Sequence, residues 1–223
     1  DGDKYDGATA TPNGLVIFAP KDADQIGIFN ATSREFSALD ISTTLCSIAS
    51  RYIGAATTAS GLVVFAPGNE DDVGLFDPFS LTFSTVNISH LGTGHKFNGA
   101  ATASNGLVIF TPYAGLLSVG VFDPISRSLS LVDVSSMMPD PSMFVDAVVC
   151  NELVVFAPFG MGFAPATVGL FDPVSLQFWT HDISAQVGIA TMMYIGAAAT
   201  FDGRVIFPAF SSGTRVGVFT VVP

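Results

Sequence analysis

Short apolar runs alternate with polar turns along the chain, and one such unit is repeated five times. Each copy opens with an aromatic residue and small residues, passes through a turn into an apolar run ending Phe-x-Pro or Phe-Pro, and later reaches Gly-x-Phe. The copies begin at Tyr5, Tyr52, Phe97, Phe144 and Tyr194. A unit of this size cannot bury its apolar face alone, so the repeat predicts an array of packed units.

The second copy shows the elements of one unit most clearly. Residues 52–58, 62–67, 71–77 and 83–88 are rich in β-branched and aromatic residues and predict four strands, which we call A to D. Ser-Gly and Asp-Pro pairs between them predict tight turns, and no segment has a helical period. Four antiparallel strands repeated in this way are typical of the blades of a β-propeller.

The chain is therefore predicted to be a single all-β domain, a five-bladed β-propeller of four-stranded antiparallel blades. The blades span approximately 5–45, 52–91, 97–136, 144–185 and 194–223. Only four D strands can be found, at 36–41, 83–88, 129–134 and 178–183, so the last blade is predicted to have three strands. The edge strand of this blade, around 216–221, is expected either to be covered by another polypeptide or a second copy of the chain, or to be exposed to solvent and kept from pairing by the charge of Arg215.

Small and aromatic residues recur at fixed positions of the unit. Gly-Ala pairs in the A strands, beginning at Gly7, Gly54, Gly99 and Gly196, predict close approach of neighbouring blades near the axis. Phenylalanines recur in the B and C strands and predict the packing between blades: Phe18, Phe65, Phe110, Phe156 and Phe207, then Phe29, Phe76, Phe122, Phe171 and Phe219. A glycine two residues before each C-strand phenylalanine predicts a bulge or close backbone approach there.

Composition narrows the function classes. Hydrophobic residues make up 49% and charged residues 12% of the 223 residues, and the mean hydropathy is +0.53. Gly, Pro, Asn or Asp interrupts every apolar run, so no transmembrane segment is expected. The net charge of −11 argues against binding nucleic acid or an anionic membrane surface.

The string Phe-Asn-Gly-Ala-Ala-Thr-Ala-Ser-Asn-Gly-Leu-Val-Ile-Phe-Thr-Pro at 97–112, followed by Val-Gly-Val-Phe-Asp-Pro at 119–124, is Kelch-like in style without the diagnostic double glycine. It resembles repeats abundant in dinoflagellate and other algal proteins, and the resemblance covers nearly the whole chain. It implies the fold and an algal source, but no activity, because propellers host unrelated functions. With a first residue Asp1 rather than Met, it implies a processed protein of the plastid (thylakoid) lumen or the secretory route.

Loops on one face differ most between copies. The B–C loops and D–A connections share this loop face, where variation between copies favours binding. Its first half is acidic, with Asp22, Asp24, Glu70, Asp71 and Asp72. Its second half is apolar and predicts a partner-binding surface, made of Tyr113, Leu116, Leu117, Met137, Met138, Met143, Phe159, Met161, Phe163, Met192 and Met193. The alternative is that these loops fold inward and plug the channel.

No catalytic motif stands out. The acidic run at 69–72 lacks calcium-loop spacing and is interpreted as a solvated turn, and the three histidines lack metal-ligand spacing. Asp146 replaces the A-strand glycine in copy four and is expected beside Asp6 and Asn98 as a candidate channel ligand site. A glycosidase carboxylate pair is hard to assemble there, so a hydrogen-bonded substitution is the preferred interpretation of Asp146.

These observations predict a non-catalytic protein-interaction or structural module without cofactor or metal. The resemblance adds a peripheral subunit of a larger membrane-associated complex of an algal plastid, with protein partners. A carbohydrate-binding propeller and a degenerate glycosidase-type hydrolase stay as alternatives.

Overall fold

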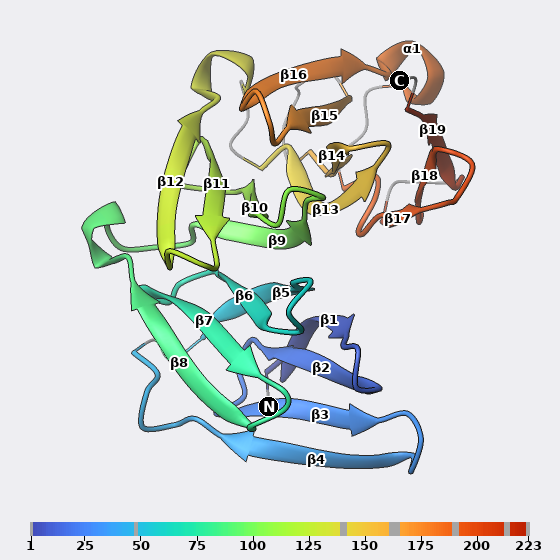
Figure 1. Ribbon diagram of the computed structural model, residues 1–223. Helices are drawn as coiled ribbons and strands as arrows, with labels where there is room; N and C mark the ends of the chain where they lie inside the picture. The colour runs from blue at the N-terminus through green and yellow to red at the C-terminus, as the bar shows by residue number, and fades with distance from the viewer. Residues whose placement is uncertain are drawn as a thin grey trace.

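Five antiparallel sheets follow one another in chain order around a common centre (Figure 1). The computed structural model describes residues 2–46, 49–138, 142–160, 166–188, 192–211 and 215–221, and the statements below refer to these. Four sheets have four strands and the fifth has three. The chain thus folds as a five-bladed β-propeller with a three-stranded last blade, as its repeats predict.

Each blade is a meander whose first strand lies nearest the centre (Figure 1). Blade 1 contains β1 (Tyr5–Ala10), β2 (Leu15–Pro20), β3 (Gln25–Asn30) and β4 (Glu35–Asp40). Blade 2 contains β5 (Tyr52–Thr57), β6 (Val63–Pro67), β7 (Asp72–Asp77) and β8 (Thr82–Asn87). Blade 3 contains β9 (Phe97–Thr102), β10 (Val108–Pro112), β11 (Ser118–Asp123) and β12 (Ser128–Asp133). Blade 4 contains β13 (Phe144–Cys150), β14 (Leu153–Pro158), β15 (Thr167–Asp172) and β16 (Gln177–Asp182). Blade 5 contains β17 (Ala198–Ala199), β18 (Arg204–Phe207) and β19 (Gly217–Thr220).

In the described residues, helical structure is confined to single turns between blades. They are η1 (Ser89–Leu91), η2 (Ser135–Met137) and α1 (Ser184–Val187), each directly after a fourth strand. No helix among the residues described above has the length and apolar character needed to cross a membrane.

Glycine allows the inner strands to approach one another closely. A Cβ added to Gly7 would lie 2.7 Å from the Cα of Gly54, and one added to Gly54 would lie 2.9 Å from the Cα of Gly99. Gly7 and Gly54 also have positive φ, at a register shift in β1 and β5. The bulge therefore lies in the inner strand. The C-strand glycines are covered by rings instead, because a Cβ on Gly74 would lie 3.0 Å from Cζ of Tyr52.

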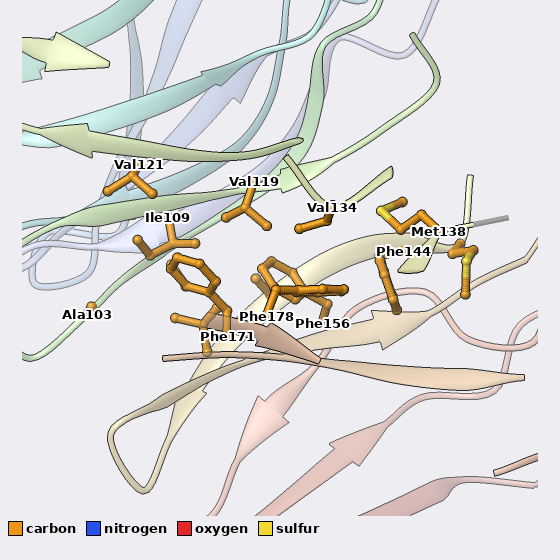
Figure 2. Packing of buried hydrophobic residues seen from close by; sticks show 14 residues of the cluster. Ala103, Ile109, Val119, Val121, Val134, Met138, Phe144, Phe156, Phe171 and Phe178 are labelled. Atoms are coloured by element: carbon orange, nitrogen blue, oxygen red, sulfur yellow. The ribbon is translucent and has the colours of Figure 1, made fainter. Parts of the chain in front are cut away.

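Each interface between consecutive blades packs an aliphatic face against an aromatic face. Figure 2 shows the interface of blades 3 and 4, where Val119 and Val121 face Phe156 and Phe171. The same arrangement joins blades 1 and 2, 2 and 3, and 4 and 5. Fully burying a phenylalanine contributes roughly 1.5–3 kcal/mol, so these four cores are the main source of stability.

Blades 1 and 5 are not joined in this way. The described residues form four buried clusters, one for each consecutive pair of blades, and none joins blade 5 to blade 1. A Cβ on Gly196 would meet Asp146 and Pro208 at 3.7 Å, and no atom of β1. The five blades thus form an arc whose two ends are blades 1 and 5 (Figure 1).

Candidate binding surfaces

A pocket of about 470 Å³ opens where the inner strands begin, at the centre of the loop face. It brings together the three predicted channel residues, Asp6, Asn98 and Asp146. It also contains Lys21, His95 and Phe210, which the sequence did not indicate, and Tyr113 and Phe159, which were predicted as part of the partner-binding surface. The pocket can hold a small ligand with both polar and apolar groups.

Asp146 joins the inner strands of blades 4 and 5. One carboxylate oxygen accepts a hydrogen bond from the Ala147 amide at 2.8 Å, and the other accepts one from the Ala197 amide at 3.2 Å. The pKa of Asp146 is raised to about 6, mainly by burial and to a smaller extent by the charge of Asp6, against the lowering effect of these hydrogen bonds. Because both oxygens are engaged by backbone amides, the first role of Asp146 is to hold two strands together.

Several other polar groups of the pocket also have partners, although Nε2 of His95 is buried without a hydrogen-bond partner in the described residues. Lys21 forms an ion pair with Asp6 at 3.0 Å, and the Asn98 amide nitrogen donates to the carbonyl of Val145 at 3.2 Å. His95 packs on the ring of Tyr113 with centroids 4.7 Å apart. Burial lowers the pKa of His95. Within the described part of the chain, no three His, Cys, Asp or Glu side chains are grouped to hold a metal ion.

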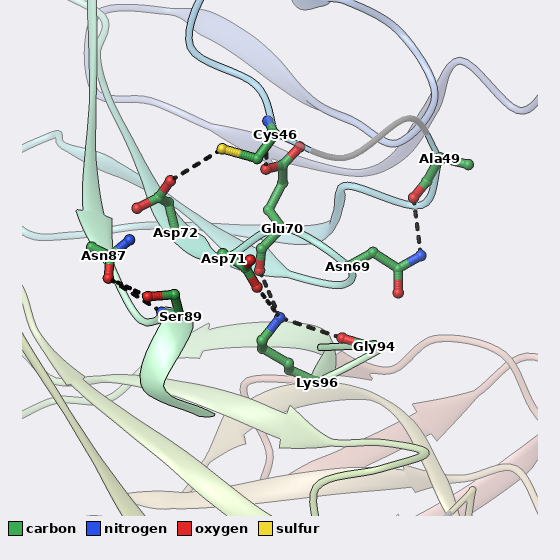
Figure 3. Close-up of polar contacts among 10 residues, drawn as sticks. All are labelled: Cys46, Ala49, Asn69, Glu70, Asp71, Asp72, Asn87, Ser89, Gly94 and Lys96. Carbon is green, nitrogen blue, oxygen red and sulfur yellow. Dashed lines mark hydrogen bonds and ion pairs between the residues drawn. The ribbon is translucent and has the colours of Figure 1, made fainter. Parts of the chain in front are cut away.

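The acidic loops of blades 1 and 2 bind basic side chains, which corrects the expectation of a solvated turn at 69–72. Glu70 is 1% exposed, and Lys96 is 3% exposed. The Lys96 ammonium donates to the Glu70 carbonyl and pairs with the Asp71 carboxylate, both at 3.0 Å (Figure 3). Arg51 pairs with Asp24 at 2.8 Å. The acidic residues therefore fasten successive blades together.

A sequence signal for these pairs exists at the residue before the first aromatic of each copy. That residue is basic in the first three copies (Lys4, Arg51 and Lys96) and methionine in the last two (Met143 and Met193). Arg51 and Lys96 meet acidic loops, whereas both methionines are buried in apolar cores. Each loop is thus matched in chemistry to the start of the next blade.

Much of the predicted apolar binding surface lies inside the protein. Met138, Met143, Met193 and Phe159 are at most 8% exposed, because the three methionines lie in the cores between blades 3, 4 and 5 and Phe159 lines the central pocket. Partly buried residues are Tyr113, Leu116, Leu117 and Met192, and Met137 is exposed. Met161 and Phe163 lie outside the described residues. The three buried methionines are not available to a protein partner, so only the remainder of this surface stays a prediction.

The largest change of environment between equivalent residues occurs on the aromatic face of blade 1. Tyr52 and Phe65 of blade 2 are completely buried, but the equivalent Tyr5 and Phe18 of blade 1 are only half-buried. Phe36 of β4 is 56% exposed. Their rings still pack together, with centroids 5.8 to 6.2 Å apart. Blade 1 therefore presents an assembled aromatic face to solvent.

Blade 5 presents the complementary aliphatic face. Val168 and Leu170 of β15 are 0% and 7% exposed, because they pack on blade 5. The equivalent Val216 and Val218 of blade 5 are 59% and 61% exposed. The sequence could not reveal this exposure, since the same residue types occupy these positions in every blade.

Comparison with known proteins supports the fold. No protein-family model matches the chain, and no curated protein sequence matches it. Similar solved structures include a catalytically inactive histidine-to-alanine variant of virginiamycin B lyase from Staphylococcus aureus with quinupristin, at 16% identity and a TM-score of 0.75 over 99% of this chain and 71% of the lyase chain. The WD40 repeats of RRP9 match at 15% identity and a TM-score of 0.62, over 94% of this chain and 62% of that chain.

Hydrazine synthase from Kuenenia stuttgartiensis matches at 10% identity and a TM-score of 0.65, over 98% of this chain and 66% of that chain. These neighbours include enzymes and a WD40 repeat domain. At such low identity they establish the propeller fold alone and do not decide between enzyme and binding module.

Proposed function

We propose that the protein is a non-catalytic interaction module that binds a β-rich polypeptide through the exposed faces of blades 1 and 5. One observation carries the proposal: equivalent residues are buried at the interfaces between blades and exposed at the ends of the arc. Phe36 is 56% exposed, whereas Phe178 at the same position of blade 4 is 6% exposed. Contiguous apolar surface of this kind marks protein contact sites.

The residues at the exposed face of blade 1 indicate which kind of surface its partner has. Aromatic faces pack on aliphatic sheet faces at all four interfaces within the chain. Lys4 occupies the position at which Arg51 and Lys96 meet acidic loops, yet it is exposed, and no ion pair of its ammonium is found in the described residues. An aliphatic sheet face with a carboxylate-bearing loop complements this end.

A groove of about 630 Å³ runs beside this face. Its lining includes Lys4, Tyr5 and Phe36, together with the carboxylates Asp22, Asp24 and Asp40. The groove supports a contact that follows the surface of blade 1 from its inner strand to its outer strand.

The more specific assignments rest on the sequence resemblance. They are a peripheral subunit of a membrane-associated complex, an algal plastid source, and residence in the thylakoid lumen or on the secretory route. Identification of the partner tests all three together.

The proposal is tested by affinity purification from the native source, with quantitative mass spectrometry of what is retained. We expect one partner in near-stoichiometric amount with the unaltered protein and its loss with Phe36→Ser or Val218→Ser. Ile125→Ser is the matched control, because Ile125 is 94% exposed in the turn between β11 and β12. Thermal unfolding verifies that each variant is folded. Equal retention by all four proteins contradicts the proposal.

The pocket of about 470 Å³ at the centre of the loop face supports carbohydrate binding as the second candidate function. The rings of Phe159 and Phe210 stack beside the polar groups of the pocket, with centroids 6.2 Å apart and planes inclined by 30°. Sugars bind to such mixtures of rings and hydrogen-bonding groups. A glycan array with the unaltered protein and Phe210→Ala tests this candidate. Saturable binding that Phe210→Ala removes supports it, and the absence of any glycan signal rejects it.

A further inference from the structure

Two sets of equivalent repeat positions form the pocket at the centre of the loop face. The inner positions are the two residues after the first aromatic of each copy, and all five blades contribute to the pocket through them. The outer position is the third residue after the B-strand phenylalanine, and in four of the five blades it lines the pocket. The chemistry of the pocket therefore follows from how the copies differ at these positions.

The inner positions carry two carboxylates in different electrostatic surroundings. Asp6 forms an ion pair with Lys21 at 3.0 Å. The charge that acts on Asp146 is that of Asp6, which has the same sign, and none of the ion pairs in the described residues includes Asp146. A largely buried carboxylate without a counter-charge is unfavourable, so a cation in the pocket would stabilise its ionised form.

Asp146 has acceptor positions left for such a cation. A carboxylate offers about four of them, two on each oxygen. The amide of Ala147 uses one position on one oxygen, at 2.8 Å, and the amide of Ala197 uses one on the other oxygen, at 3.2 Å. Asp146 lines the pocket, so its remaining positions can face a ligand.

The outer position is aromatic in three successive blades, with Tyr113 in blade 3, Phe159 in blade 4 and Phe210 in blade 5. Asp146 belongs to blade 4, the middle one of the three. Backbone bonds hold two of the ring-bearing loops together, because the Met193 amide donates to the Phe159 carbonyl at 3.2 Å and the Phe210 amide donates to the Met193 carbonyl at 2.8 Å. Aromatic faces attract cations, most strongly where water is excluded.

Other classes of ligand fit this arrangement less well. Lys21 already pairs with both Asp3 and Asp6, so an anion would gain little from it and would be repelled by Asp146. A neutral ligand would leave Asp146 without a counter-charge. A cation with apolar substituents uses both the carboxylate and the rings.

We propose that the central pocket binds an organic ammonium ion, with its positive charge beside Asp146 and its apolar substituents against Tyr113, Phe159 and Phe210. The ion is either a small free amine or a methylated lysine side chain of another polypeptide, and the two share the alkylated ammonium group. This inference is independent of the contact proposed for blades 1 and 5. It assigns the pocket a ligand class different from that of the carbohydrate candidate.

The first test compares two small molecules of the same shape by ligand-observed NMR titration. One is choline, and the other is the neutral alcohol in which a tert-butyl group replaces the trimethylammonium group. Choline should bind saturably, and the alcohol should bind about tenfold more weakly, because it lacks the charge. A peptide with trimethyllysine and the same peptide with unmodified lysine show whether a polypeptide is the better source. This comparison uses the unaltered protein, so it does not depend on the folding of a variant.

Two variants locate the binding in the pocket. Asp146→Asn should weaken choline binding about tenfold, and Phe210→Ala about threefold. Asp133→Asn is the matched control, because it changes the net charge equally. Asp133 is an exposed residue at the end of β12, bonded to the Ser135 amide at 2.9 Å, and its replacement should leave choline binding unchanged. Thermal unfolding verifies that each variant is folded.

The pH dependence supplies a readout that a purely structural role of Asp146 would not produce. Choline keeps its charge at every pH, and the pKa of Asp146 is about 6. Affinity should therefore fall about tenfold between pH 7 and pH 5, as Asp146 takes up a proton. Protonation of His95 in the same pocket acts in the same direction, and Asp6 and Lys21 also face the ligand. The Asp146→Asn protein, which keeps these three residues, should show a smaller fall.

Three results would overturn the proposal: no saturable binding of choline or of the trimethyllysine peptide, equal binding of the neutral alcohol, or unchanged binding by Asp146→Asn. A glycan signal without ammonium binding would also overturn it and would assign the pocket to carbohydrates. Phe36→Ser should bind choline normally, because Phe36 lies on β4, far along the blade from the inner strand. Failure of the pocket proposal is thus distinguishable from failure of the proposed function.

Discussion

Blade 2 and blade 1 are built from nearly the same residue types, but they lie in different surroundings. Phe65 of blade 2 is completely buried against Ile17 and Ile26 of blade 1. Phe18, its equivalent in blade 1, is covered by no other blade among the described residues and is half-buried. The comparison shows that the same residue at the same position of the repeat contributes differently to stability in different blades. The reason is that the neighbouring blade supplies half of each core.

Replacing Phe65 and Phe18 separately with alanine gives the largest predicted difference in stability between equivalent residues. Phe65→Ala should lower the free energy of unfolding by about 3–5 kcal/mol, because it leaves a cavity in a closed core. Phe18→Ala should cost about 1 kcal/mol, since part of that ring is already in contact with water. Denaturant unfolding measures both. Equal losses would mean that blade 1 is covered in solution, which would contradict its exposed face.

The second prediction concerns the pH dependence of stability, to which the buried carboxylate of Asp146 contributes. Its folded pKa of about 6 lies above its ordinary value of 3.8, so its charge destabilises the fold above pH 6 and this penalty disappears as the pH falls toward 4. The change is at most about 3 kcal/mol. The lowered pKa of His95 acts in the opposite direction below pH 6.5, so the readout is a difference between proteins.

The measurement is the melting temperature of the unaltered protein and of Asp146→Asn between pH 7 and pH 4.5. The unaltered protein should gain stability relative to Asp146→Asn as the pH falls. Carboxylates such as Asp40 and Asp182, whose pKa values are lowered by hydrogen bonds, titrate below this range. Parallel curves for the two proteins would show that Asp146 is not buried as an ionised group.

Inner-strand glycines give the smallest contrast. Gly54 and Gly196 both have positive φ, which costs alanine roughly 1–2 kcal/mol. At Gly54 the new methyl would also meet the backbone of Gly99 at 2.9 Å, whereas at Gly196 the nearest atoms are 3.7 Å away. Gly54→Ala should therefore be the more damaging, by about 1–3 kcal/mol, in denaturant unfolding. A reversed order would mean that blade 5 packs tightly against blade 1.

Local patterns predicted the blades well because strand and turn signals act over a few residues. The D strands were predicted one residue too late at both ends: 36–41 was expected, and Glu35–Asp40 is observed. Ile41 looks like a strand residue because it is apolar and buried, but its amide bonds to the Asp24 carbonyl in a loop. Burial and strand pairing are thus separate properties.

The candidate site was predicted less well, because loop side chains can fold inward or outward with the same sequence. Met143 seemed suited to an exposed contact surface, and it is 4% exposed in a core. Conversely, Glu70 was expected in a solvated loop, but it is buried in contact with Arg51 and Lys96. A comparison of the residue before each first aromatic would have indicated both outcomes.

The sequence by itself determined the repeat, the four-stranded blade and the inner glycines, since each depends on residues close together in the chain. Only the tertiary structure decided which copies of Phe18, Phe36 and Val218 face water. That depends on which blades lie side by side, because each core takes one face from each of two neighbouring blades. Among the described residues, the aromatic face of blade 1 and the aliphatic face of blade 5 take part in no such core.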